Sequence, residues 1–358
     1  MFNFINTWYK RYFTDPQASL LVILLTLGLI IFVTMGKMLA PLLAALIIAY
    51  LLEGAVSKLQ IKNISRFSSV NIVYSLFLVL MAFILFGLMP LLSRQVSKFF
   101  QEVPEMIRNV QGLFLRLPEQ YPELVSQEYV LELNENVRDS FSELGESVLS
   151  FSLASMPAVI TILVYLILVP LMIFFFLKDK KIVMVWVTNF LPKERNLVNE
   201  VWVEMDAQIG NYVRGKFNEI LIVGAASYIA FVILGLNYAF LLAMIVGVSV
   251  LIPYIGAAIV TLPVALVGYF QWGLSSDFTW LIISYFAIQF LDGNILVPIL
   301  FSEAVNLHPL AIIVAILVFG GLWGFWGVFF AIPLATLVKA LINVWPINEE
   351  DTKKIKKK

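Results

Sequence analysis

One short segment places several chemically useful side chains inside an otherwise apolar stretch. Asp292 and Asn294 flank Gly293, while Gln289 precedes the acid and Pro298 follows it. An ionisable group at membrane depth costs about 2.5–3.5 kcal/mol on insertion scales, so it usually lines a path or meets a partner. Glycine and proline both weaken a helix, and irregular backbone in a membrane is tolerated where it lines a cavity. The segment therefore predicts a cation or proton site in a broken helix.

A structural interpretation of the same segment stays open. Asp292 and Asn294 could bond freed backbone groups where the helix restarts, or lie at the membrane edge. Gln289 and Asp292 share a helix face, and Asn294 joins them only if Gly293 breaks the helix. We expect no second carboxylate close to the depth of Asp292, which argues against an intramembrane aspartic protease.

A second interruption lies at Pro253, Tyr254 and Gly256. Proline removes a backbone donor and glycine permits unusual backbone angles, so carbonyl groups here could coordinate a ligand. Tyr254 could offer its hydroxyl to a small polar solute. The alternative is a tight turn between two helices.

Three basic side chains could serve as an entry or relay. The single histidine, His308, precedes Pro309 at the predicted start of the last long apolar segment, where it is a helix-start residue or a proton relay. Arg214 and Lys216 enter an apolar segment from the cytoplasm. They are expected to anchor the chain by reaching the interface, or alternatively to guide an anion or pair with Asp292.

Glycines recur in the last apolar segment at Gly320, Gly324 and Gly327. Small residues at this spacing favour close helix contact, and a gating hinge is the alternative. The sequence contains no phosphate-cradling Walker A pattern, so it does not support ATP-driven pumping.

The composition predicts an all-α polytopic membrane protein. Hydrophobic residues make up 61% of the chain and charged residues 13%, against about 45–50% and about 25% in soluble domains.

With no cysteine and one histidine, we expect no metal site and no cofactor. The formal net charge is zero, so nothing suggests a nucleic-acid partner. The expected partners are the lipid bilayer and a small solute, Na⁺ or H⁺.

The apolar segments suggest about seven or eight membrane passes. They fall at about 19–36, 38–52, 70–92, 156–177, 219–235, 238–252, 255–270, 279–301 and 308–343. The segment 38–52 and the two that meet at Pro253 are short enough to be half-helices or re-entrant hairpins. The last segment is long enough to bend at its glycines.

Charge in the loops predicts both the organisation and the orientation. Lysine and arginine follow the segments that end near residues 52 and 177 and close the chain, which places those loops and both termini in the cytoplasm. We expect four regions: an N-terminal transmembrane region at 1–92, an extracytoplasmic insertion of amphipathic helices at 93–155, a transmembrane core at 156–343 and a basic tail at 344–358. Within the core, 178–212 is expected to hold a cytoplasmic amphipathic helix.

Several motifs in this order resemble the AI-2E family of bacterial transporters, especially its permease-type members. They are Asn211-Tyr212-Val213-Arg214-Gly215-Lys216, Leu251–Gly256, Leu291–Pro298, Leu307–Leu310 and Phe319–Pro333. The resemblance is specific from about 160 to 343 and extends more loosely over the chain. Lys216 departs from the family pattern, in which glutamine is frequent at this place.

The resemblance implies a homo-oligomer in the bacterial inner membrane. It also implies export of the autoinducer-2 signal, as in some members, or exchange of sodium or lithium for protons, as in others. From the residues and the resemblance together, we predict an ATP-independent exporter or exchanger of a small polar solute or ion, and not an enzyme. The alternative is a membrane scaffold that recruits envelope proteins through the insertion at 93–155.

Overall fold

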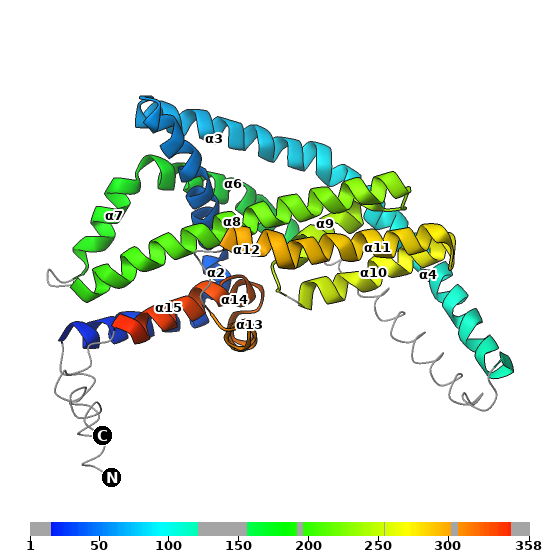
Figure 1. The fold of residues 1–358 in the computed structure, drawn as a ribbon. Helices are drawn as coiled ribbons and strands as arrows, with labels where there is room; N and C mark the ends of the chain where they lie inside the picture. The colour runs from blue at the N-terminus through cyan, green and yellow to red at the C-terminus, as the bar shows by residue number, and fades with distance from the viewer. Residues whose placement is uncertain (1–15, 121–155, 192–195, 254, 302–306, 345–358) are drawn as a thin grey trace, which may run out of the picture.

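The computed structural model describes residues 16–120, 156–191, 196–253, 255–301 and 307–344 (Figure 1). Within these ranges the chain forms helices and no strand. The longer helices are α2 (Pro16–Ile61), α3 (Arg66–Phe83), α4 (Met89–Gln120), α6 (Met156–Lys178), α8 (Asn196–Leu234), α10 (Ile255–Trp272), α11 (Ser276–Leu291), α13 (Pro309–Trp323) and α15 (Ala331–Val344). The shorter ones are α7 (Lys180–Asn189), α9 (Ala239–Ser249), α12 (Val297–Phe301), α14 (Phe325–Phe329) and two π-helices, η1 (Ile84–Leu88) and η2 (Asp292–Leu296).

Six of the described helical stretches are long and apolar enough to cross a membrane. They are Met38–Ile61, Arg66–Met106, Thr161–Lys178, Asn196–Leu234, Ile255–Trp272 and Ser276–Phe301. Shorter apolar helices lie at Ser19–Gly28, Ala239–Ser249, Pro309–Trp323 and Ala331–Ile342. Their outer faces expose many large apolar side chains, as lipid-facing surfaces do. The predicted all-α, polytopic membrane fold is confirmed. The expected seven or eight passes would need one or two of the shorter helices to cross as well.

The N-terminal bundle packs α2 against α3 and α6 around a core that includes Ala45, Val56, Val70 and Ile173. α2 is one helix of 46 residues that continues through Pro41, so the segment 38–52 is not a separate half-helix. Packing against α6 and α3 along this stretch holds the helix together where sequence reasoning expected an interruption.

Charged side chains gather at one end of this bundle. Arg66 donates from both terminal nitrogens to the two carboxylate oxygens of Glu53, at 3.1 and 3.2 Å, and also to the carbonyl of Leu177. Lys180 lies 3.2 Å from the same carboxylate. Two of the basic segments predicted to be cytoplasmic therefore lie on the same side of the protein.

The predicted insertion begins as α4, which continues the direction of α3 through η1 (Figure 1). Its first half rests on α9: Phe99 packs edge-to-face on Tyr238, and Gln95 accepts a hydrogen bond from the amide of Leu241. These contacts partly cover the beginning of the predicted apolar face, at Val96 and Phe99. The second predicted helix of the insertion, from Val130 to Val148, lies outside the described residues.

α8 is the longest element of the C-terminal half, at 39 residues, and crosses the centre of the molecule (Figure 1). Sequence reasoning separated a cytoplasmic amphipathic helix from a following span, but here both belong to one uninterrupted helix. Its apolar stripe continues from Val201 and Met205 into Val223 and Phe231, so the packing surface gives no reason for a break.

The C-terminal core packs α8 against α9 and α11, and α10 packs against α9 and α11. At Gly247 a β-carbon would come within 2.9 Å of the Ile220 carbonyl and 3.0 Å of the Gly224 α-carbon. Two facing glycines thus let α8 and α9 approach backbone to backbone, which is how small residues serve helix packing in membranes.

The last apolar segment folds back on itself, and α13 contacts both α14 and α15. Gly324 ends α13 with φ 58° and ψ −132°, a conformation that L side chains rarely adopt. A β-carbon on Gly327 would collide with the Phe319 carbonyl, and one on Gly320 would meet Val328. The predicted bend is present, and these glycines make the close contacts that it requires.

Candidate functional site

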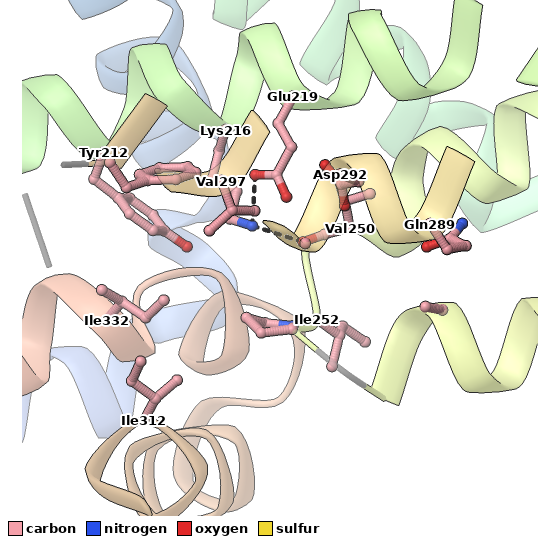
Figure 2. Close-up of a pocket in the computed structure, with 14 residues that line it drawn as sticks. Tyr212, Lys216, Glu219, Val250, Ile252, Gln289, Asp292, Val297, Ile312 and Ile332 are labelled. Atoms are coloured by element: carbon pink, nitrogen blue, oxygen red, sulfur yellow. Dashed lines mark hydrogen bonds and ion pairs between the residues drawn. The ribbon is translucent and has the colours of Figure 1, made fainter. Parts of the chain in front are cut away.

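A cavity of about 370 Å³ lies where α8, the α9–α10 turn, η2, α12 and the α13–α15 hairpin meet (Figure 2). Its polar lining comes from four side chains on two helical segments: Lys216 and Glu219 on α8, and Gln289 and Asp292 on α11–η2. The remaining lining residues are Tyr212, Val250, Ile252, Pro253, Ala257, Gly293, Val297, Phe301, Ile312 and Ile332. The cavity is therefore mostly apolar, with a few convergent polar groups, as small-molecule sites are.

Lys216 and Glu219 form a buried ion pair. The Lys216 Nζ lies 2.7 Å from a Glu219 carboxylate oxygen and donates to the Val250 carbonyl at 2.8 Å. The two residues are 4% and 2% exposed. Their spacing of three residues puts both on one face of α8. The ammonium also lies 5.3 Å from the centre of the Phe301 ring, so the cation is held by a carboxylate, a carbonyl and an aromatic face.

Asp292 stands at the first residue of η2, where the helix changes from α to π geometry. Its Oδ1 is buried and has no hydrogen-bond partner among the described residues, and the same holds for Gln289 Nε2. Single π-helical turns within α-helices are frequent at functional sites. The sequence predicted a broken helix here. The structure instead has a continuous helix that bulges, because Val297 N–H bonds to the Asp292 carbonyl and carries the helix past Gly293.

The α9–α10 turn supplies backbone to the cavity. Val250, Ile252 and Pro253 line it, and the Val250 carbonyl accepts the Lys216 hydrogen bond. A β-carbon on Gly256 would collide with the Ser249 carbonyl, so this glycine permits the tight turn and does not line the cavity. Tyr254 lies outside the described residues.

The structure thus brings together Gln289, Asp292, Gly293, Pro253 and Lys216 among the predicted site residues. Other predicted residues lie elsewhere. Asn294 is exposed and donates to the Phe290 carbonyl one turn back, and Pro298 is also exposed and does not line the cavity.

The proposed relay and entry residues divide as well. His308 is the N-cap of α13 and accepts from the Leu310 amide, which agrees with the helix-start interpretation. Arg214 is exposed, donates to Asn211 and lies over the Tyr50 ring. Lys216 differs from the expected interfacial anchor: it is buried in the cavity beside Glu219.

Sequence reasoning missed Glu219. We expected no second carboxylate near the depth of Asp292, but Glu219 lines the same cavity. The available signal was the Lys216–Glu219 spacing at the start of an apolar run, together with a lysine that departs from the family pattern. Among the described residues, no group of three or more histidines, cysteines or acids could hold a metal ion.

These features define a polytopic α-helical membrane protein with a mostly apolar cavity that contains a few charged groups. The family model for "AI-2E family transporter" matches residues 20–347, and the chain belongs to this family. It is 46% identical to "Putative permease PerM" of Escherichia coli (strain K12), over 97% of this chain and 98% of the relative. It is 29% identical to "Putative transport protein YueF" of Bacillus subtilis (strain 168), over 84% of this chain and 82% of the relative. The resemblance first seen in the motifs is confirmed.

Proposed function

We propose that this membrane transporter moves a small polar solute or ion through the Lys216–Asp292 cavity without ATP, in exchange for a proton or cation that binds at Asp292. The observation that supports this most directly is the unpartnered Asp292 Oδ1 in a cavity that already contains a complete Lys216–Glu219 ion pair. A buried carboxylate oxygen without a partner is unfavourable, so a proton or a bound cation is the natural complement.

The cavity lies between α8 and α11–η2 on one side and the α13–α15 hairpin on the other, and α15 also packs directly on α8. Small movements of the hairpin relative to α8 would change access to Asp292. The break at Gly324 is a candidate hinge for that movement. We further propose export or exchange across the bacterial inner membrane by a homo-oligomer with cytoplasmic termini.

The first experiment measures cation–proton exchange in everted membrane vesicles. Respiration builds a pH gradient that quenches a fluorescent dye, and sodium or lithium is then added. We expect the wild-type protein to relieve the quenching and Asp292→Asn to abolish this response. Asp277→Asn is the matched control, since Asp277 is exposed in the first turn of α11 and does not line the cavity.

Equal activity of Asp292→Asn at every pH and sodium concentration would contradict coupling at this carboxylate. No response from either protein would favour transport of an organic solute or the alternative function, a membrane scaffold. For a scaffold, deletion of residues 120–150 should abolish partner binding, while Asp292→Asn should leave it intact.

A further inference from the structure

The cavity holds an excess of one negative charge. Lys216 and Glu219 neutralise each other at 2.7 Å, and Asp292 has no ion-pair partner among the described residues. Two carboxylates against one ammonium leave one charge uncompensated when all three are ionised. An anionic solute would meet both carboxylates in surroundings of low dielectric constant, where like charges repel strongly. The occupant that complements this lining has a single positive charge.

The size and the walls of the cavity leave room for an occupant larger than a small inorganic cation at Asp292. Its volume of about 370 Å³ falls within the range of about 300–1,000 Å³ typical of small-molecule sites. Hard cations such as Ca²⁺ and Mg²⁺ take about six or more oxygen ligands. Here much of the wall is aliphatic, from Val250, Ile252, Val297, Ile312 and Ile332. Such a wall suits an occupant that has an apolar body.

Two aromatic rings stand beside the charged groups. Tyr212 and Phe301 have ring centres 5.9 Å apart, and the Lys216 ammonium already lies over Phe301. The Tyr212 hydroxyl donates to the Phe329 carbonyl, so this group is engaged and the ring remains as an apolar wall. Aromatic faces attract ammonium groups, including quaternary ones. Such a wall suits a cationic occupant, which would lie against the rings away from the Lys216 ammonium because the two like charges repel.

We infer that the solute of this transporter is a monovalent organic cation with an apolar or aromatic body. Its charge lies against Asp292, and its body lies against the aliphatic and aromatic wall. A proton on Asp292 neutralises the same charge, so proton and solute exclude each other and exchange follows. The unpartnered Gln289 Nε2 favours a solute with a hydrogen-bond acceptor near its charge. This inference rests on the proposed function and specifies the class of solute.

The test uses the full-length purified protein in proteoliposomes with an imposed inside-acid pH gradient. The probe is radiolabelled benzyltrimethylammonium, whose permanent charge prevents it from collapsing the gradient as a weak base would. We expect uptake by the wild type and by Asp277→Asn, and no uptake above empty liposomes by Asp292→Asn. Phenylacetate and N-benzylacetamide carry the same ring with a negative charge or none, and excess of either should not compete.

A second variant tests the aromatic wall. Phe301→Leu keeps an apolar side chain but removes the ring, so the half-saturation concentration should rise about 2- to 30-fold, the usual range for loss of a cation–π contact. Phe325→Leu is the control, because Phe325 is exposed and lies outside the cavity. An equal half-saturation concentration in both variants would contradict the aromatic contribution.

The outcomes separate the two proposals. If sodium or lithium exchange depends on Asp292 while benzyltrimethylammonium is neither transported nor competes, the solute class is wrong and the proposed function stands. Competition by phenylacetate or N-benzylacetamide equal to that of the unlabelled cation would also overturn the class. If Asp292→Asn equals the wild type in every assay, the proposed function fails and the inference fails with it.

Discussion

Within the part of the chain that the structure describes, two cavities have equal volumes of about 370 Å³ each, and a π-helix borders both. Asp292, the first residue of η2, lines one. Ile84, the first residue of η1, lines the other. This second cavity, the apolar cavity, lies in the N-terminal bundle and is lined by Ile48, Phe77, Leu80, Met81, Ile84, Ile162, Tyr165, Leu166, Val169 and Pro170. The same backbone geometry thus accompanies two different chemical environments.

The difference shows that a π-helical turn by itself does not make a polar site. At η1 the sequence Ile-Leu-Phe-Gly-Leu supplies no polar side chain, whereas η2 supplies a carboxylate that faces an ion pair. In the N-terminal bundle the charged cluster of Glu53, Arg66 and Lys180 lies at one end of the helices. In the C-terminal core the Lys216–Glu219 pair lies within the packed helices. The position of charge, more than helix geometry, distinguishes the two regions.

The largest expected effect comes from removing the internal cation. Lys216→Met leaves Glu219 buried and unpaired, and loss of one partner of a buried ion pair costs about 3–5 kcal/mol. Denaturant unfolding in detergent, followed by tryptophan fluorescence, measures the change. The double variant Lys216→Met/Glu219→Leu should recover most of the loss, because replacing both partners removes the uncompensated charge. A single variant as stable as the wild type would mean that the pair contributes nothing to the core.

Ile84→Asp would place an acid at the first position of η1, the position that Asp292 occupies in η2. Without a nearby lysine the acid should destabilise the protein by about 2.5–3.5 kcal/mol, the cost of a charge within a membrane span. The same unfolding assay measures it, and Ile84→Leu, a volume-conserving change, should cost less than about 1.5 kcal/mol. If Ile84→Asp were tolerated and exchanged cations, π-geometry alone would suffice to make a site.

Much of the fold could be predicted from the sequence, because composition and apolar run length respond to the membrane directly. The sequence also predicted Asp292, Gln289 and Pro253 as site residues, since polar or helix-breaking residues stand out in apolar surroundings. It did not predict that α8 is one helix. A charged, amphipathic stretch next to an apolar one looks like a boundary, yet helical backbone can continue through both.

The features of the site that the sequence did not predict depend on contacts between distant segments of the chain. Lys216 looked like an interfacial anchor because two of its partners, the Val250 carbonyl and the Phe301 ring, lie far along the chain from it. Asn294 looked like part of the site because it is near Asp292 in sequence, but it bonds to the Phe290 carbonyl on the exposed side. Whether a side chain faces a cavity depends on how its helix is rotated about its own axis. At a π-helical turn this rotation changes, and the local sequence pattern does not show by how much.

A smaller effect is expected at the end of the N-terminal bundle. Glu53→Gln removes the negative charge that joins Arg66 and Lys180, and we expect a loss of about 1 kcal/mol, since partly exposed ion pairs contribute little. The loss should shrink at high salt. Unfolding at low and high ionic strength measures it, and Glu102→Gln, which breaks the exposed Lys98–Glu102 pair, is the control with almost no effect. A salt-independent loss larger than that of Lys216→Met would reverse the contrast between the two regions.

The smallest expected effect is at Gly293. Open space surrounds the position where a β-carbon would be, so Gly293→Ala should raise stability by about 0.5 kcal/mol through lower backbone entropy in the unfolded chain. Thermal unfolding is sensitive enough to detect this. Gly256→Ala is the contrasting variant and should destabilise clearly, because its β-carbon would collide with the Ser249 carbonyl. Destabilisation by Gly293→Ala would show that η2 needs glycine for its geometry.

The π-helical turn at Asp292–Leu296 also has a consequence for chain length. Its characteristic bond spans five residues, from Val297 N–H to the Asp292 carbonyl, where an α-helix would use four. Deleting one residue from this turn would restore an α-helix and rotate Gln289 and everything before it by about 100° relative to α12. The number of residues in this turn therefore determines which side chains of the helix point toward the cavity. A homologue aligned with a one-residue gap here would present a different face of its helix to the cavity, even with every neighbouring residue unchanged.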